Sequence, residues 1–172
     1  MNQSTFEVPA DQRYFEHYVP GSIFEFGEIE VNKEEVIEFA RRFDPQALHV
    51  DPTAAERGPF GGLIASGWHT AGLMMRLFTE HYLSSVASLA SPGVDELRWI
   101  RPVRPGDILR VRVVVLSANR SRSRPDRGMV RSGIEVLNQR GEVVMSVTAM
   151  NLFRCGTAAN SGSLADARDE AK

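Results

Sequence analysis

The segment from Trp68 to Tyr82 constrains the fold more than any other part of the sequence. Its apolar residues cover most of the circumference of a helix: Trp68, Ala71, Gly72, Leu73, Met74, Met75, Leu77, Phe78 and Tyr82. A helix that is apolar nearly all round must be buried on several sides. Arg76, Glu80 and His81 interrupt the run, so it falls short of the roughly 18 apolar residues that span a bilayer. The rest of the chain must therefore cover this helix.

The sequence after this helix predicts an antiparallel sheet. Four segments have the composition of strands, at residues 94–101, 107–117, 128–137 and 142–153. The second alternates clearly, with Leu109, Val111 and Val113 on one face and arginines on the other. Residues 138–141 have the composition of a hairpin turn, and the polar run 119–127 predicts a longer one. We therefore expect a meander of four strands.

Two further elements precede the apolar helix. Residues 22–31 alternate imperfectly and predict an edge strand. Asn32 then stands three residues before Glu35, which is the spacing of a capping box, and apolar residues follow at the period of one helical face. Acidic residues in the first turn and arginines in the last suit the helix dipole and place the helix end near Phe43.

These elements define an α+β chain with one core. The 172 residues suffice for one ordinary domain and are too few for two. A curved antiparallel sheet wrapped around one long central helix is the hot-dog fold, which we predict here. We expect an N-terminal extension at 1–14, the hot-dog domain at 15–154, and a disordered tail at 155–172, where Gly, Ala, Ser and Asp follow no period.

Composition and charge restrict the possible functions. Twenty basic and 22 acidic residues give a net charge of −2, which offers no field for nucleic acid or an anionic membrane. The single Cys155 has no partner for an internal disulfide, and the first residues lack a leader pattern, so we expect a cytoplasmic protein. The four histidines lack paired spacings, so the sequence does not predict a metal site. Glycine motifs that bind phosphate are absent from the sequence, so it does not predict a nucleotide cofactor either.

Asp44 and His49 are the candidate catalytic residues. They stand five positions apart in a loop that contains Pro45, where the backbone can turn both side chains toward one water molecule. An Asp is ionised at neutral pH and a His titrates near it, so the pair can take a proton from water and deliver one elsewhere. The alternative is structural, because Asp44 followed by Pro45 also fits a helix N-cap, with His49 packed in a loop.

The glycine-rich segment 61–68 is the second candidate. Gly62 lets the backbone approach a ligand, and Ser66 and Gly67 open the buried helix. Free N–H groups and the positive end of the helix dipole can stabilise negative charge that develops on a carbonyl oxygen. Simple capping by Ser66 is an equally good interpretation, and both can hold. Ser66 does not stand in the Gly-x-Ser-x-Gly pattern of a hydrolase nucleophile.

Other polar residues have a better structural interpretation. Asp51 precedes Pro52 and is expected to cap a short helix. His69 lies on the apolar helix, where a lone histidine is expected in the core. Two groups of arginines, within 98–104 and 120–127, could contact phosphates, although arginines in turns are usually just solvated.

Residues 44–55 resemble the hydratase motif of the MaoC-like dehydratases, a hot-dog family that includes the (R)-specific enoyl-CoA hydratases. The motif runs Asp-x-Asn-Pro-aliphatic-His, then five residues and a small residue. Asp44, Leu48, His49 and Ala55 fall on the matching positions. Residues 60–67 and 97–107 resemble later segments of the family, and the resemblance covers 15–154. The family's Asn-Pro is replaced by Gln46 and Ala47, and its Gly before the Asp is Phe43.

The resemblance implies a reaction and a site. Asp44 and His49 would activate water for addition to a trans-2-enoyl-CoA, giving an (R)-3-hydroxyacyl-CoA, and which of them is the main base is open. The Gly67 N–H would hold the thioester oxygen, with Ser66 beside it, and Gln46 would supply an amide hydrogen bond at longer reach than Asn. The chain would need no cofactor and would form a homodimer or a higher homo-oligomer.

Two other functions remain open from the sequence. Hot-dog proteins include thioesterases, which usually carry a carboxylate on or beside the central helix. The helix offers only Glu80, near its far end, which counts against hydrolysis. A non-catalytic protein that binds acyl-CoA is the other alternative.

Overall fold

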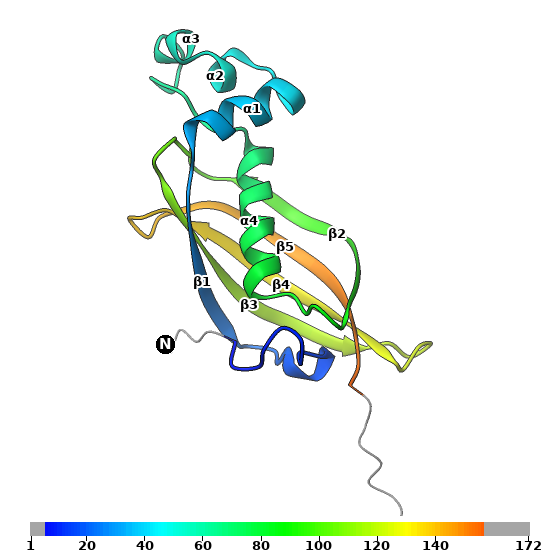
Figure 1. The fold of residues 1–172 in the computed structure, drawn as a ribbon. Coiled ribbons are helices and arrows are strands. Elements are labelled where there is room, and N and C mark those ends of the chain that lie inside the picture. Colours follow the sequence, from blue (N-terminus) through cyan, green and yellow to red (C-terminus); the bar gives the residue numbers. More distant parts are fainter. Residues whose placement is uncertain (1–5, 157–172) are drawn as a thin grey trace, which may run out of the picture.

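Helix α4 (Gly67–His81) lies against one face of a curved antiparallel sheet, as Figure 1 shows. The structure is a computed structural model, and it describes residues 6–156. The strand order is β1-β3-β4-β5-β2. The strands are β1 (Ile23–Glu30), β2 (Ser88–Trp99), β3 (Ile108–Arg120), β4 (Arg127–Leu137) and β5 (Val143–Arg154). The predicted hot-dog arrangement of sheet and central helix is therefore confirmed.

The core forms where the sheet faces α4. Leu73, Leu77 and Phe78 on the helix are buried, together with Val111 and Val113 on β3. Alternate residues of β3, β4 and β5 are buried in the same way, as expected for strands with one face on a core. Contact with the sheet explains the buried side of α4. Trp68, Gly72 and Met75 lie on an exposed face of the helix, so the expectation that the rest of the chain covers it on all sides is wrong for that face.

Strand β2 begins six residues earlier than the sequence indicated. The sequence prediction started this strand at Val94, directly after Pro92 and Gly93. Within residues 6–156, β2 pairs only with β5, so Pro92 lies in an edge strand, where a missing N–H is tolerated. The pairing is irregular there, and the Ser91 hydroxyl donates to the Met150 carbonyl at 2.6 Å.

A second irregularity in β2 is a bulge around Glu96. Asp95 pairs with Thr148 and Arg98 with Ser146, so β2 carries one residue more than β5 over this stretch. Glu96 has φ of 54°, in the left-handed region. A shift of one residue moves all following side chains to the other face of a sheet, so the bulge decides which side chains of β2 face α4.

The C-terminal end of α4 is fixed by Arg13. Its guanidinium donates hydrogen bonds to the carbonyls of His81, Tyr82 and Leu83, at 3.0, 2.7 and 3.4 Å. The last carbonyls of a helix have no partner within the helix, and a cation is stabilising beside them. Residues 6–14, which we assigned to an N-terminal extension, thus include a group that holds the central helix in place.

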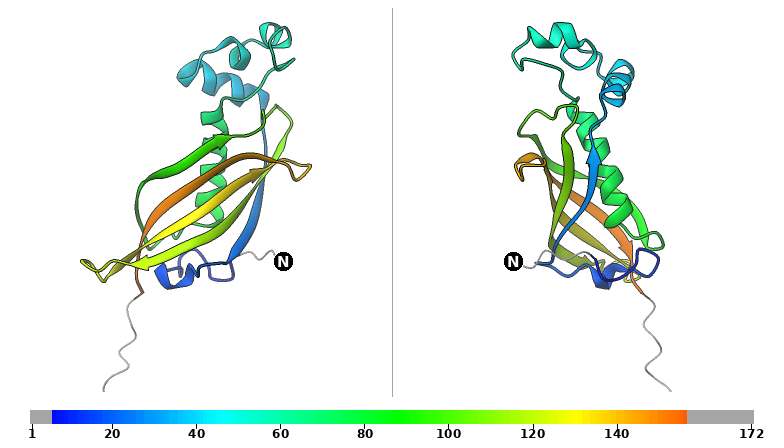
Figure 2. Two further views of the ribbon diagram at one scale, coloured as in Figure 1. Left: turned by 180° about the vertical axis from the view of Figure 1, so that it is seen from behind. Right: turned by 60° about the vertical axis from the view of Figure 1, so that its left-hand side comes forward.

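Three short helices lie over the N-terminal end of α4, beyond the end of the sheet (Figures 1 and 2). They are α1 (Lys33–Phe43), α2 (Ala47–Val50) and α3 (Pro52–Glu56). Asn32 caps α1 by accepting from the Glu35 N–H, and Asp51 caps α3 by accepting from Thr53 and Ala54, as predicted. No helix in residues 6–156 is long and apolar enough to cross a bilayer.

The alternative interpretation of Asp44 as a helix N-cap is wrong. Helix α2 begins at Ala47, with Gln46 in the capping position. Asp44 instead closes α1, because its backbone N–H donates to the Ala40 carbonyl at 2.8 Å. Its carboxylate is therefore available for other partners.

The predicted C-terminal tail begins within the described residues. Cys155 is buried, and its N–H donates to the Asp126 carbonyl at 2.8 Å. Residues 157–172, where we predicted disorder, lie outside the described residues.

We expect Glu96→Gly to raise the free energy of unfolding by about 1 kcal/mol relative to Glu96→Ala, because the left-handed conformation costs an L-residue roughly 1–2 kcal/mol. Urea unfolding of both variants measures the difference. Alanine is the matched control, since both changes remove the side chain. Glycine in an ordinary strand position is less stable than alanine, so a lower stability of Glu96→Gly would contradict the strain at this position.

Candidate active site

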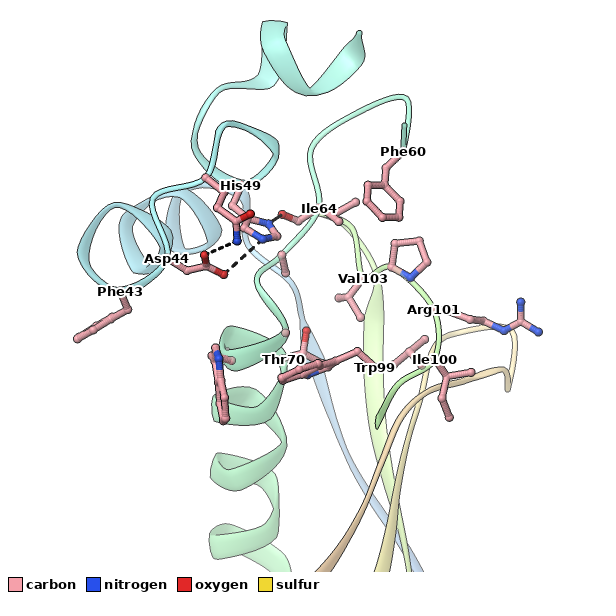
Figure 3. Close-up of a pocket in the computed structure, with 16 residues that line it drawn as sticks. Phe43, Asp44, His49, Phe60, Ile64, Thr70, Trp99, Ile100, Arg101 and Val103 are labelled. Carbon is pink, nitrogen blue, oxygen red and sulfur yellow. Dashed lines mark hydrogen bonds and ion pairs between the residues drawn. The ribbon is translucent and has the colours of Figure 1, made fainter. Parts of the chain in front are cut away.

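Asp44 and His49 meet at the top of α4, where Figure 3 shows their side chains beside one cavity. Asp44 follows the last residue of α1, and His49 lies on α2. The distance from His49 Nε2 to Asp44 Oδ2 is 3.4 Å. The cavity has a volume of about 490 Å³, and both residues line it. The structure thus brings together the two residues that the sequence singled out, and we call them the dyad.

The orientation of the His49 ring follows from its other nitrogen. His49 is buried, and its Nδ1 lies 2.8 Å from the Ile64 carbonyl oxygen. A carbonyl oxygen only accepts, so Nδ1 carries the proton. In the neutral ring Nε2 then holds the lone pair, directed toward Asp44. Nε2 is therefore the atom that can accept a proton in this site.

Asp44 is held as a carboxylate by two donors. Gln46 Nε2 donates to Oδ1 and the Ser66 hydroxyl donates to Oδ2, each at 2.7 Å. These hydrogen bonds, from Gln46 first and then Ser66, lower the pKa of the Asp44 carboxyl below its ordinary value, and the nearby His49 lowers it further. Asp44 is thus ionised at neutral pH and a poor proton acceptor.

Ser66 acts on Asp44 and on α4 at once. It is fully buried, donates its hydroxyl proton to Asp44, and accepts from the Trp68 N–H at 3.3 Å. Since the only hydroxyl proton goes to the carboxylate, Ser66 orients Asp44 in this structure. Gly67, the first residue of α4, lines the cavity, and the N–H of such a residue has no carbonyl partner within the helix.

The predicted loop residues Gln46 and Gly62 have different positions. Gln46 lines the cavity and makes the amide hydrogen bond to Asp44 that we expected from a longer side chain. Gly62 is not among the lining residues of this cavity. Its φ is 147°, and a Cβ there would lie 3.2 Å from Arg104 Nη1, so its backbone conformation and this neighbour explain the glycine.

The cavity walls are mostly apolar and come from segments far apart in the sequence. They include Phe43, Phe60, Ile64, Ala65, Trp68, Trp99, Ile100, Val103 and Val144. Thr70 and Arg101 also line it. Thr70 was missed, although it lies one helical turn after Gly67 and so shares its face.

The remaining candidates have mainly structural partners. His69 is buried and stacks on Phe39 of α1 with ring centroids 4.9 Å apart, which confirms a core position. Arg104 donates to the Phe60 carbonyl, and Arg120 forms an ion pair with Glu16. Residues 6–156 contain no group of three His, Cys, Asp or Glu residues placed to hold a metal ion.

These features define a class of protein. A hot-dog domain holds a carboxylate, an imidazole with an unprotonated Nε2 and a helix N-terminus around one apolar cavity. Such a site can exchange a proton with water next to a bound carbonyl group, which is the chemistry of hydration and dehydration.

Comparison with known proteins identifies the family. The model of the MaoC-like domain matches residues 17–139, so the chain belongs to the MaoC-like dehydratase family. The uncharacterized protein YdeM of Bacillus subtilis is 30% identical over 125 residues, covering 73% of this chain and 87% of YdeM. The 3-hydroxyacyl-thioester dehydratase Z of Mycobacterium tuberculosis is 38% identical over 84 residues, covering 48% of this chain and 56% of that protein.

Solved structures agree with this assignment. The crystal structure of a MaoC-like dehydratase from Rhodospirillum rubrum has a TM-score of 0.78 and 40% identity, covering 85% of this chain and 99% of that one. The R-hydratase PhaJ1 from Pseudomonas aeruginosa has a TM-score of 0.67 and 24% identity, covering 83% of this chain and 86% of that one, and so supports the fold. Family and relatives support an enzyme of the lyase type.

We expect Ser66→Ala to raise the pKa of Asp44 toward its ordinary value of about 3.9, because the carboxylate loses a donor to Oδ2. Carbon-13 NMR titration of the Asp44 carboxyl measures this pKa. The ionised Asp44 stabilises the fold at pH values above the pKa of the unfolded state, and this contribution is lost as pH falls through the lowered pKa of the folded state. Because Ser66→Ala raises the folded-state pKa, the variant loses this contribution at a higher pH than the unmodified protein. Ser132→Ala, a buried serine bonded to Tyr82, is the control. An unchanged pKa in Ser66→Ala would contradict the assigned role.

Proposed function

We propose that residues 15–154 form a hydratase that adds water to a trans-2-enoyl-CoA to give an (R)-3-hydroxyacyl-CoA, or catalyses the reverse reaction. The observation that carries the proposal is the placement of the His49 Nε2 lone pair and the Asp44 carboxylate at 3.4 Å, in the cavity that Gly67 also lines. Relatives named as dehydratases of 3-hydroxyacyl thioesters and of 3-hydroxybutyryl-CoA support the substrate class.

In this mechanism His49 is the base. A water beside the dyad, within hydrogen-bonding reach of both residues, donates one hydrogen bond to the Asp44 carboxylate. Nε2 takes its other proton as the oxygen bonds to the β-carbon. The electron pair of the double bond moves toward the thioester, whose oxygen accepts from the Gly67 N–H. The imidazolium then returns the proton to the α-carbon. Asp44 is the weaker base, because two donors lower its pKa, and it stabilises the imidazolium.

The cavity suits a thioester with an apolar acyl group. Its walls are mainly aliphatic and aromatic, and the polar groups gather at the dyad and Gly67. Arg101 lines the same cavity and is exposed, and its side chain extends away from the dyad in Figure 3. A cation at this position can contact the phosphates of coenzyme A.

Hydrolysis of the thioester is less well supported. Glu80, the carboxylate of the central helix, forms an ion pair with Arg76 at 3.0 Å on the exposed surface, and it is absent from the lining of the dyad cavity. Within residues 6–156, Ser66 is the only hydroxyl bonded to the dyad. It has no effective base, because its hydrogen-bond acceptor is the Asp44 carboxylate, whose pKa is lowered.

We expect Asp44→Asn and His49→Ala each to lower kcat for hydration of crotonyl-CoA by about 100-fold or more, because positioned acid/base groups contribute at least this much. Loss of absorbance of the enoyl thioester measures the rate. Asp51→Asn is the matched control, since Asp51 lies in the same region, caps α3, and Asn caps equally well.

The same assay separates the competing functions. A reduction of only a few-fold in both variants would contradict the assigned roles. Release of free thiol from the acyl-CoA, measured in parallel, would show that the protein hydrolyses the thioester instead of hydrating the double bond. Binding without turnover by the unmodified protein would identify a non-catalytic acyl-CoA-binding protein.

We propose further that the chain forms a homodimer through β2. Within residues 6–156 this strand has one neighbour, and Val86 and Val94, on and beside it, are exposed and lie outside the dyad cavity. A second copy paired along β2 would satisfy the unpaired edge and cover these side chains.

We expect Val94→Lys to convert the dimer to a monomer, because Val94 lies in the middle of β2 and each copy would bring a charge into the proposed seam. Light scattering coupled to size exclusion measures the mass. Leu116→Lys, an equally exposed position on β3, is the control and should leave the dimer intact. A monomeric unmodified protein, or a dimer in both variants, would contradict the β2 interface.

A further inference from the structure

The indole of Trp99 lies directly against the backbone of Gly67. A Cβ built on Gly67 would overlap the ring, and Trp99 Cε2, Nε1 and Cδ2 are its nearest atoms. Gly67 is not among the glycines with positive φ, so its backbone conformation does not require glycine. The position of the Trp99 ring therefore requires glycine at residue 67. This contact joins the last residue of β2 to the residue whose N–H faces the proposed thioester oxygen.

The bulge at Glu96 is what brings Trp99 to this position. After the bulge, Trp99 pairs with Met145 of β5, which is fully buried on the face toward α4. Paired residues of neighbouring strands share a face, so Trp99 faces α4 as well. Without the extra residue, Arg98 would face the helix and Trp99 the opposite side. The left-handed conformation of Glu96 is the strain that accompanies this placement.

Trp99 bounds the cavity on the side of the central helix. Figure 3 shows it reaching from the end of β2 toward the first turn of α4, on the opposite side of the cavity from the dyad. It also contacts Trp68 edge to face, with ring centroids 5.3 Å apart. Trp99 packs on Gly67 and also lines the cavity, and the residue as a whole is 47% exposed.

The cavity stops at this level of α4. On the helix its lining consists of Gly67, Trp68 and Thr70, all within the first turn. The next inward residues, Leu73, Met74 and Leu77, are buried in the core and are not part of the lining. An acyl chain that continued along α4 toward them would have to pass the position that Trp99 occupies.

We infer that Trp99 is a specificity-determining residue that limits the acyl group to short chains. The inference rests on the proposed function, because it takes the thioester to lie at Gly67 and the reacting carbon at the dyad. The ring closes the space between β2 and the first turn of α4. The unmodified enzyme therefore prefers crotonyl-CoA to trans-2-hexenoyl-CoA and trans-2-decenoyl-CoA.

The test compares kcat/KM for these three substrates in the unmodified protein, Trp99→Ala and Trp99→Leu. Leucine keeps an apolar side chain against Gly67, so Trp99→Leu remains informative if Trp99→Ala does not fold. Circular dichroism checks that each variant is folded. Leu116→Ala, on the sheet and outside the cavity, is the control. One methylene accommodated or excluded by a pocket changes kcat/KM by roughly tenfold or more. We expect the ratio of decenoyl to crotonyl activity to rise at least about tenfold in both Trp99 variants and to stay unchanged in the control.

A binding measurement separates this inference from the proposed function. Titration calorimetry with butyryl-CoA and decanoyl-CoA gives the chain-length preference without any turnover. If neither the unmodified protein nor any variant hydrates a substrate, and the Trp99 variants still gain affinity for decanoyl-CoA, the proposed function fails and the inference holds. An equal loss of rate and affinity for all chain lengths would overturn the inference, because Trp99 would then only pack on Gly67. A long-chain preference of the unmodified protein would overturn it too.

Discussion

The hydrogen bond from the Ser66 hydroxyl to Asp44 is the interaction on which the candidate site depends. It joins the start of the central helix to a carboxylate 22 residues earlier in the chain. The same hydroxyl accepts from the Trp68 N–H, so the first turn of α4, the Gly67 N–H and the Asp44 carboxylate are held in one fixed relation. Because the sheet and Arg13 fix α4 itself, the position of the Asp44 carboxylate follows from the fold.

The electrostatics of the dyad follow from neighbouring backbone and side-chain groups. The Ile64 carbonyl assigns the proton of His49 to Nδ1, which leaves the lone pair on Nε2 toward Asp44. Gln46 and Ser66 both donate to Asp44, which keeps it ionised. The site therefore contains one proton acceptor and one fixed negative charge, a division of roles that suits transfer of a single proton from water to carbon.

The sequence predicted those parts of the molecule that local rules determine. The cap at Asn32, the apolar surface of α4 and the alternation of β3 were sufficient for the fold, and the spacing of Asp44 and His49 was sufficient to select the dyad. A local rule also suggested that Asp44 caps a helix, which is wrong because α2 begins only at Ala47. Residue type and spacing did not reveal that the loop directs this carboxylate toward Ser66.

Features that depend on pairing between distant segments were not predictable. The start of β2 was misplaced because Pro92 is acceptable only in an edge strand, and strand order is not visible in composition. The position of Trp99 depends on one extra residue in β2 relative to β5, about fifty residues later in the chain. Sequence reasoning thus located the dyad, while the shape of its cavity required the structure.

A crystal structure of Asp44→Asn with a bound 3-hydroxyacyl-CoA tests the central claim most directly. The account predicts that the thioester oxygen lies within hydrogen-bonding distance of the Gly67 N–H. It also predicts that the 3-hydroxyl lies beside the dyad, within hydrogen-bonding reach of residue 44 and of His49 Nε2, in the place of the attacking water. A thioester bound away from Gly67, or a 3-hydroxyl out of reach of both residues, would contradict it.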